Sequence, residues 1–309
     1  MSIIAPNLYF PSPNYITTKI PNISALNSTC LLFTSPQFHN YTLKIQSSFK
    51  MAQNPAVVQQ KIYIPNKNNN KLVGVLHDTR SKGIVVICHG YRCTKEFFTL
   101  VNLAVALESE GISVFRFDFS GNGESEGSFQ FGNYQEEVED LRSVVEHFTH
   151  SGRAVTAVLG HSKGGNNVLL YASKYHDILA VVNVSGRYQM DRGIKERLGE
   201  DFLERLKKDG FIDMKNEAGE VEYRVTKESM MERLNTNMHE ACLLISDKCR
   251  VLTVHGSADE VIPVEDAIEI SKLIRNHKLH IVEGANHSYT SHQSELAAVV
   301  VPFIKENFQ

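Results

Sequence analysis

The sequence predicts an α/β protein with an open, mostly parallel central sheet that has helices on both faces. Short, unbroken apolar runs recur between residues 84 and 282, as they do in strands buried on both faces of a parallel sheet. Amphipathic segments with apolar residues at helical spacing separate these runs. The chain has 309 residues, of which 42% are apolar, so it can bury one large core with a modest insertion.

The predicted elements follow one another in a regular order. Residues 60–64 and 71–76 alternate or run apolar around an Asn-rich turn, which predicts an antiparallel hairpin. Later apolar runs predict strands at 84–88, 112–117, 154–159, 178–184, 251–254 and 279–282. Helical spacing of apolar residues predicts one helix that starts at about Phe97 and ends before a C-cap at Gly111, and further helices near 135–149, 164–175, 264–274 and 292–307.

Residues 190–247 interrupt this alternation. Apolar residues recur there every four positions and predict one amphipathic helix with Ile194, Leu198, Phe202 and Leu206. A hairpin is predicted at 211–225, and a second helix is predicted to begin near Thr226 and to carry Met230, Leu234 and Met238. The block is too long for a loop and too short for an independent domain. We therefore expect a cap at 190–247, inserted into a core formed by residues 58–189 and 248–309.

The first 50 residues differ from the rest in composition. They contain twelve Ser and Thr, three Lys and no acidic residue, and the first acidic residue of the chain is Asp78. This composition is typical of an organellar transit peptide, and of a plastid one in particular because Arg is absent. The alternatives are a disordered tail, or translation that starts at Met51 and gives a cytoplasmic protein. In each case we expect residues 1–50 to lie outside the fold.

Composition also excludes several classes of protein. The net charge of −3 gives no reason to expect a nucleic acid or an anionic membrane as partner. No apolar run approaches the ~18–20 residues of a membrane-spanning helix, so no integral membrane association is expected. The five cysteines lack metal-ligand spacing and predict free thiols. We expect a monomer or weak dimer without a cofactor or a bound metal.

The most informative motif is Gly160-His161-Ser162-Lys163-Gly164, which lies between a predicted strand and a predicted helix. A G-x-S-x-G segment in this setting forms a sharp turn that strains the serine and needs small residues two positions before and after it. The helix that follows directs backbone N–H groups and its positive dipole end toward a developing oxyanion. The pattern predicts Ser162 as a nucleophile. The alternative is a glycine-rich turn with an incidental serine.

A serine nucleophile needs a base and a residue that orients the base. Asp259 follows a predicted strand directly, and His287 follows the last predicted strand. Both lie at carboxyl ends of strands, where such sheets build their sites, and the order Ser, acid, His agrees with the expected chain order. Two other acids compete with Asp259. Glu260 is expected to point away from its neighbour's direction, and Asp266 falls within a predicted helix.

An oxyanion hole needs two hydrogen-bond donors. The backbone N–H after the nucleophile, that of Lys163, is the first candidate. The second is expected in the loop after an early strand, where Tyr91 N–H is the first choice and Arg92 N–H the alternative. The residues His89-Gly90 are otherwise explained as a simple tight turn.

Five groups of residues occur in a characteristic order: His89-Gly90-Tyr91, Asp118-x-x-Gly121-x-Gly123-x-Ser125-x-Gly127, Gly160-x-Ser162-x-Gly164-Gly165, His255-Gly256-x-x-Asp259 with Pro263, and Gly284-x-x-His287. This set resembles the α/β-hydrolase superfamily. It is most similar to the serine-aminopeptidase-like branch with cinnamoyl (feruloyl) esterases and monoacylglycerol lipase-like enzymes, whose plant members carry a similar cap. The resemblance covers about residues 60–307. It implies an α/β-hydrolase fold with Ser162, Asp259 and His287 as triad, and with the Tyr91 and Lys163 amides as oxyanion donors.

The predicted function is hydrolysis of a small carboxylic ester through an acyl-enzyme. Thioester hydrolysis, acyl transfer and a lyase reaction use the same scaffold, and a non-catalytic ligand receptor is the alternative outside enzymes. The apolar faces predicted for the cap suggest an ester with an apolar or aromatic moiety, in contact with Phe202 and Met230. Packing of the cap on the body is an equal explanation for the methionines.

Overall fold

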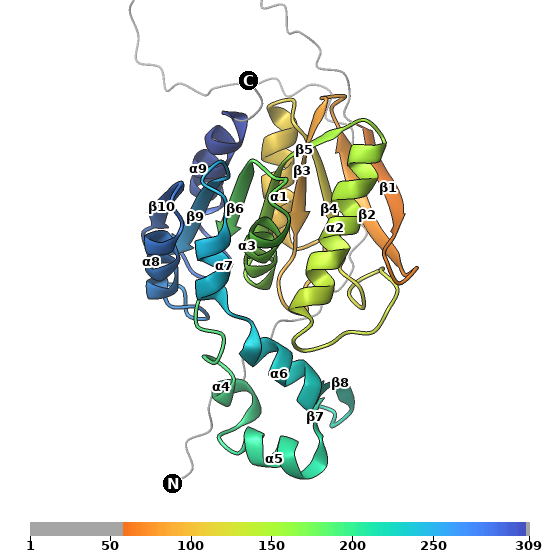
Figure 1. Cartoon of the computed structure of the whole chain (residues 1–309), viewed down its shortest axis with the longest axis vertical. Coiled ribbons are helices and arrows are strands. Elements are labelled where there is room, and N and C mark those ends of the chain that lie inside the picture. The colour runs from red at the N-terminus through yellow and green to blue at the C-terminus, as the bar shows by residue number, and fades with distance from the viewer. Residues whose placement is uncertain (1–57, 307–309) are drawn as a thin grey trace, which may run out of the picture. The chain divides into compact units, whose positions relative to one another are not determined.

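The computed structural model describes residues 58–306, so the predictions for residues 1–50 lie outside the described residues. An eight-stranded sheet runs through the described part in the order β1-β2-β4-β3-β5-β6-β9-β10 (Figure 1). Its strands are β1 (Val58–Pro65), β2 (Lys71–Asp78), β3 (Gly83–Cys88), β4 (Ser113–Phe117), β5 (Ala154–His161), β6 (Ala180–Val184), β9 (Arg250–Gly256) and β10 (His277–Val282).

The sheet is largely parallel, which confirms the predicted fold class. β1 and β2 form the antiparallel hairpin, and β2 also pairs antiparallel with β4. All pairs from β4 through β10 are parallel. Every residue of β3 and β4 is buried, as expected for unbroken apolar runs in the middle of a sheet that is covered on both faces.

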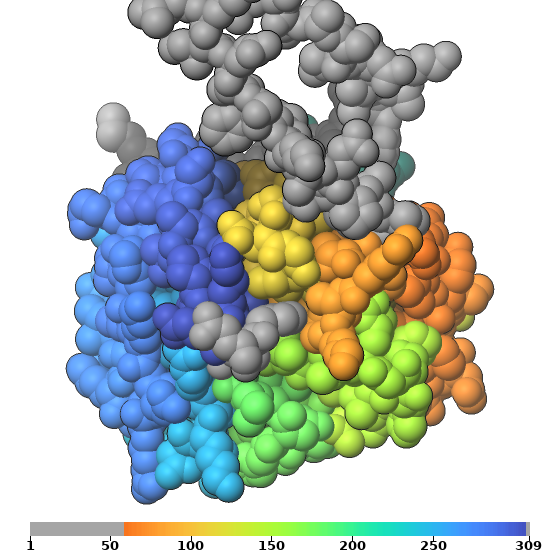
Figure 2. All heavy atoms as spheres, turned by 90° about the horizontal axis from the view of Figure 1, so that it is seen from above, coloured from red at the N-terminus to blue at the C-terminus, as the bar shows by residue number. Residues whose placement is uncertain are grey.

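Helices cover the two faces of the sheet with separate apolar clusters. One cluster joins the sheet to α2 (Tyr134–His150), α3 (Lys163–Tyr175), α7 (Met238–Leu244) and α8 (Val264–Leu273). The other joins it to α1 (Phe98–Ser109) and α9 (Gln293–Lys305). These last two helices are far apart in sequence but lie side by side (yellow and dark blue in Figure 2), with Asn102 Nδ2 3.1 Å from Gln293 Oε1.

The segment between β6 and β9 forms most of a third apolar cluster, which Phe131 of the core also joins. It contains α4 (Lys195–Leu198), α5 (Phe202–Asp209), the two-stranded sheet of β7 (Phe211–Lys215) and β8 (Val221–Thr226), and α6 (Lys227–Asn235). These elements gather at one end of Figure 1, below the strands of the large sheet. The single helix predicted over 194–206 is wrong. Gly199, at φ +93°, ends α4 after one turn, and α5 starts afresh at Phe202.

The second predicted helix is also divided. α6 ends at Asn235, the backbone is extended at Thr236 and Asn237, and the Asn237 side chain then caps α7 by accepting from Glu240 N. Met238, on α7, packs in the cluster beneath α3 rather than with Met230. We therefore propose a cap, named here as residues 190–235, that is shorter than the predicted 190–247.

Candidate active site

Ser162 occupies the tight turn between β5 and α3. Its φ of 56° and ψ of −122° are strained for a residue with a side chain. Its backbone N–H donates to Val184 O on the neighbouring strand β6, at 2.8 Å. Glycine is required two residues before Ser162, because a Cβ on Gly160 would lie 2.0 Å from Gly164 O. The turn therefore holds the half-buried serine at the carboxyl edge of the sheet, as the G-x-S-x-G pattern predicted.

Asp259 and His287 are joined by a hydrogen bond of 2.7 Å between Asp259 Oδ2 and His287 Nδ1. Asp259 Oδ1 accepts from the backbone N–H groups of Val261 and Ile262, at 2.9 and 2.8 Å. Burial alone would raise the pKa of Asp259, but the hydrogen bonds from His255 and His287 outweigh it and hold the pKa well below its usual range. An ionised Asp259 makes His287 Nδ1 the protonated nitrogen and leaves Nε2 as the basic one.

His255 is a second imidazole on Asp259, and the sequence interpretation gave it no role. Its Nε2 lies 2.9 Å from Ile262 O and 3.3 Å from Asp259 Oδ2. Its Nδ1 is buried without a hydrogen-bond partner in the described part of the chain. Since a carbonyl oxygen only accepts, Nε2 carries the proton and donates toward both oxygens. The fully buried ring therefore supports both the acid and the turn that follows it.

Two further residues fix the backbone of His287, and the sequence interpretation missed both roles. Glu260 Oε2 accepts from His287 N at 3.2 Å, and His161 Nε2 donates to His287 O at 2.8 Å. Burial lowers the pKa of His161 to about 3, so its ring is neutral. The one available signal was position, since each residue is adjacent to a predicted triad member. The other competing acid, Asp266, accepts from Tyr188 N instead.

These contacts bring the three predicted residues to one edge of the sheet without completing a hydrogen-bonded chain. His161, which directly precedes Ser162, has its ring centroid 4.8 Å from that of His287. The hydrogen bonds of His287 in the described structure go to His161, Glu260 and Asp259, and none goes to Ser162 Oγ. Nucleophile–base hydrogen bonds are often long in structures without substrate, so proton exchange between the two belongs to the proposed mechanism.

The loop after β3 lies against Ser162. A Cβ added to Gly90 would lie 3.1 Å from Ser162 Cβ, so the backbone approaches the serine closely. His89 holds the loop from beneath: its Nε2 accepts from Phe119 N at 3.0 Å, and its Nδ1 donates to Gly90 O at 2.8 Å. Burial lowers the pKa of His89 to about 4, in agreement with this neutral tautomer. Tyr91, the predicted second donor, follows Gly90 in this loop.

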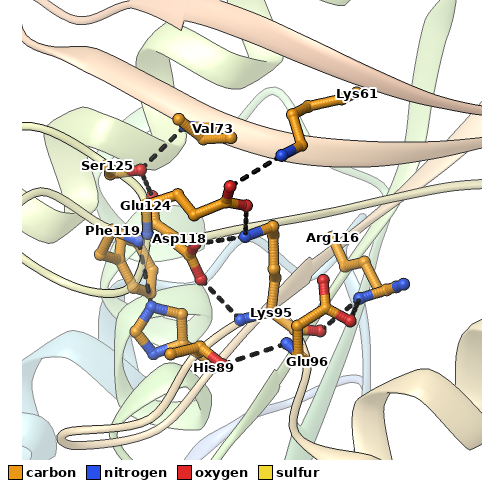
Figure 3. A network of polar contacts seen from close by, with 11 residues as sticks. Lys61, Val73, His89, Lys95, Glu96, Arg116, Asp118, Phe119, Glu124 and Ser125 are labelled. Atoms are coloured by element: carbon orange, nitrogen blue, oxygen red, sulfur yellow. Dashed lines mark hydrogen bonds and ion pairs between the residues drawn. The ribbon is translucent and has the colours of Figure 1, made fainter. Parts of the chain in front are cut away.

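A buried ionic network supports the same loop from the side of β4 (Figure 3). Asp118 accepts from Lys95 N at 2.7 Å and from Lys95 Nζ at 2.6 Å, and Lys95 Nζ also donates to Glu124 Oε2 at 2.6 Å. A Cβ on Gly123 would lie 2.3 Å from Asp118 Oδ2, so this glycine makes room for the carboxylate. The motif thus has a structural role: it holds Asp118 in contact with the loop after β3.

The side chain of Lys163 is buried and has a structural role. Its Nζ pairs with Glu137 Oε1 at 2.7 Å and lies 4.8 Å from the centroid of the Tyr134 ring. Asn167 Nδ2 donates to the other oxygen of Glu137 at 2.6 Å. The backbone N–H of Lys163 is in the first turn of α3, where helices leave N–H groups without an internal partner. That N–H is therefore available as the predicted first donor.

Phe202 and Met230 lie in the apolar cluster of the cap, where they are 5% and 0% exposed. The structure shows packing for both, and a contact with substrate stays a prediction. Two surface hollows of about 360 and 620 Å³ lie elsewhere, and neither is lined by Ser162, Asp259 or His287. No helix among residues 58–306 has the length and apolar character needed to cross a membrane.

Several known proteins share this sequence pattern or fold. Residues 79–218 match the Hydrolase_4 family model, described as serine aminopeptidase, S33. Est1E from Butyrivibrio proteoclasticus, solved with ferulic acid bound, has a TM-score of 0.70 and 23% identity over 80% of this chain and 98% of that chain. A monoacylglycerol lipase of Mycolicibacterium smegmatis is 31% identical over 111 residues, 35% of this chain and 39% of the lipase. An uncharacterized protein of Saccharomyces cerevisiae is 24% identical over 77% of this chain and 76% of that protein.

The sheet order, the strained serine turn and these matches define the class of this protein. The chain has the α/β-hydrolase fold, and residues 79–218, just under half of its length, match the serine aminopeptidase, S33 family. The family match includes Ser162 and the loop with Tyr91, whereas Asp259 and His287 lie beyond its end.

Proposed function

We propose that the protein hydrolyses carboxylic esters, with Ser162 as nucleophile, His287 as general base and Asp259 as the residue that orients the base. The observation that carries the proposal is the 2.7 Å hydrogen bond between buried Asp259 and His287, at the same sheet edge as the strained Ser162. A serine hydroxyl is a poor nucleophile alone, and an oriented imidazole is the group that activates it.

In the proposed reaction, Ser162 Oγ attacks the ester carbonyl carbon while His287 Nε2 takes the hydroxyl proton. The oxyanion that forms accepts from the N–H groups of Lys163 and Tyr91, each worth roughly 3–4 kcal/mol of transition-state stabilisation. The C–O bond then breaks, and His287 returns the proton to the leaving alcohol. Water hydrolyses the acyl-serine by the same steps, releases the carboxylic acid and restores Ser162. The reaction uses no cofactor or metal ion.

The proposed substrate is a small ester with an apolar or aromatic moiety. Aromatic side chains gather beside the loop after β3, where Phe129 and Tyr223 pack edge to face with Tyr91. Apolar and aromatic surfaces of this kind suit aromatic and acyl groups. The names of two similar proteins agree with this class: one was solved with ferulic acid, and the other is a monoacylglycerol lipase.

Labelling with a fluorophosphonate, together with turnover of an ester and thioester panel, tests the proposal. Wild-type protein should be labelled on Ser162 and should hydrolyse esters, whereas Ser162→Ala should lose both with its fold intact, because one hydroxyl is removed. The expected loss in kcat is at least about a thousandfold. A variant that keeps more than about a hundredth of the wild-type rate would exclude Ser162 as nucleophile. Faster turnover of thioesters than of matched esters would reassign the substrate class.

A further inference from the structure

The ring of Tyr91 packs between two core residues, Phe129 and Phe131, and the cap, although its backbone belongs to the core loop after β3. Its ring centroid lies 5.6 Å from that of Phe129, 5.7 Å from that of Phe131 and 6.3 Å from that of Tyr223, all in edge-to-face geometry. Tyr223 is on β8 of the cap. The Tyr91 hydroxyl is buried and makes no close hydrogen bond in the described structure, but the side chains of Tyr223 and Arg197 both interact with it, so the cap contacts the hydroxyl as well as the ring.

Arg197 of α4 contacts the same ring from another part of the cap. Its guanidinium carbon lies 4.4 Å from the Tyr91 ring centroid, which is cation–π geometry. Among the residues that the structure describes, no carboxylate lies within ion-pair distance of this guanidinium. Arg197 thus interacts with both the ring and the hydroxyl of Tyr91, and two separate cap elements converge on one core residue.

The next residue of the loop is also held by β8. Arg92 has a φ of +50°, a left-handed conformation that costs about 1 kcal/mol or more for a residue with a side chain. Its guanidinium carbon lies 4.6 Å from the Tyr223 ring centroid, and its Nη2 lies 3.0 Å from Glu222 Oε2. Neighbouring residues of β8 therefore hold two consecutive loop residues, one of them in a strained conformation.

This loop is the one that carries the proposed oxyanion donor. Gly90, directly before Tyr91, approaches Ser162 closely, and Cys93 N donates to Gly90 O at 3.3 Å to close a tight turn over residues 90–93. In so short a turn, the position of the Tyr91 ring and the position of its backbone N–H are set together. A displacement of about 1 Å of a catalytic group can cost about a hundredfold in rate.

We propose that the cap positions the oxyanion donor, and that Tyr223 and Arg197 are positioning residues that fix the Tyr91 N–H through its ring. The inference rests on the proposed function and adds a role for the cap in that same site. A cap that only selects substrate changes KM and the order of preferred substrates. A cap that positions the oxyanion donor changes kcat by a similar factor for every ester, including one too small to reach the cap.

Steady-state kinetics on p-nitrophenyl acetate and p-nitrophenyl octanoate separate these two roles. Tyr91→Ala keeps the backbone N–H and removes the ring, and Tyr223→Ala removes its main cap partner. Both should lower kcat about 10- to 100-fold on both esters, with KM for the acetate changed less than about twofold. Arg197→Ala should give a smaller loss of the same kind. Tyr223→Phe keeps the ring and removes the hydroxyl, so it should recover most of the kcat that Tyr223→Ala loses.

The matched control is Arg224→Ala, on the same strand as Tyr223. Arg224 pairs with Asp213 at 2.6 Å, stacks over Phe211, and makes none of the contacts with the 90–93 turn. It should leave kcat unchanged. Retention of wild-type kcat on the acetate by folded Tyr91→Ala and Tyr223→Ala would overturn the inference, as would equal losses in Arg224→Ala. If Tyr223→Ala loses its fold by circular dichroism, Arg197→Ala and Tyr91→Ala decide. Absence of labelling and turnover in wild-type protein would instead refute the proposed function itself.

Discussion

The core and the cap, which meet at the 90–93 turn, are stabilised by different kinds of contact. In the core, charged groups are buried in pairs: the side chains of Lys95 and Asp118 are 2% and 0% exposed at a separation of 2.6 Å. In the cap, the pair Arg224–Asp213 is 51% and 22% exposed, and the buried contacts are mostly between aliphatic side chains. Buried pairs are costly to break, whereas exposed pairs contribute little.

This difference suggests that the two regions have different roles. The groups proposed to carry out the reaction, Ser162, Asp259 and His287, depend on core contacts that leave few alternative positions. The cap depends on several contacts of small individual strength, so it can change by substitution without loss of the fold. The comparison predicts large stability effects for changes in the core and small, local ones for changes in the cap.

The largest expected effect is on the buried pair of Glu137 and Lys163. Glu137→Ala leaves the Lys163 ammonium buried without its counter-ion, which should lower the free energy of unfolding by about 3–5 kcal/mol. Urea unfolding measures this difference. Replacing both residues, in Glu137→Leu with Lys163→Met, should recover most of the loss, because no unpaired charge remains and the backbone N–H of residue 163 is retained.

The cap offers the matched control for this pair. Asp213→Ala breaks an ion pair of similar length on the cap surface and should leave the urea midpoint unchanged within error. An equal loss of stability in Asp213→Ala and Glu137→Ala would contradict the contrast between the two regions.

A smaller effect is expected from pH, through the buried histidines of the core. Burial lowers the folded-state pKa of His161 to about 3, against about 6.5 in an unfolded chain. Between these values the unfolded state binds more protons, so the contribution of His161 to stability is complete above pH ~6.5 and declines as pH falls toward 3. Between pH 7 and pH 5 this decline amounts to about 2 kcal/mol for one such histidine.

Other buried groups of the core also change the pH dependence of stability, so the effect of His161 has to be measured as a difference between two proteins. Burial raises the pKa of Glu137 and of Asp140, and these carboxyls therefore contribute the opposite slope. The test compares the pH dependence of the urea midpoint in wild-type protein and in His161→Asn, where the decline from pH 7 to pH 5 should be shallower. Parallel curves for the two proteins would show that His161 is not a buried neutral group.

The same contrast explains which features could be predicted from the sequence. The core strands and the Asp259–His287 pair follow from motifs at strand ends, where backbone topology alone brings residues together. The roles of His161 and His255 depend on which way a buried ring faces, and no local pattern encodes that. In the cap, the period-four pattern continues through Gly199, so periodicity alone cannot show that the positive φ of this glycine ends the helix.

The smallest predicted effect concerns the contact that joins the cap to α2. Glu232, on α6, accepts from Asn133 N at 3.0 Å and from Gln135 N at 2.9 Å. A carboxylate of the cap therefore caps the N-terminus of the core helix α2. Asn133 at that terminus has a φ of 57° and makes no side-chain cap hydrogen bond. Glu232→Gln removes the charge and one acceptor, and should weaken this contact by about 0.5–1 kcal/mol.

Because the cap has its own apolar cluster, loss of this contact should appear as local opening and not as a change in global unfolding. Hydrogen exchange of the α6 amides, or limited proteolysis between β7 and β8, should be about two- to fivefold faster in Glu232→Gln, at an unchanged urea midpoint. The control is Glu228→Gln, which removes an exposed acid from the first turn of the same helix and should change both rates less than Glu232→Gln, because only a solvent-screened interaction with the helix dipole is lost. Equal acceleration in the two variants would mean that the charge of α6, and not its contact with α2, keeps the cap closed on the core.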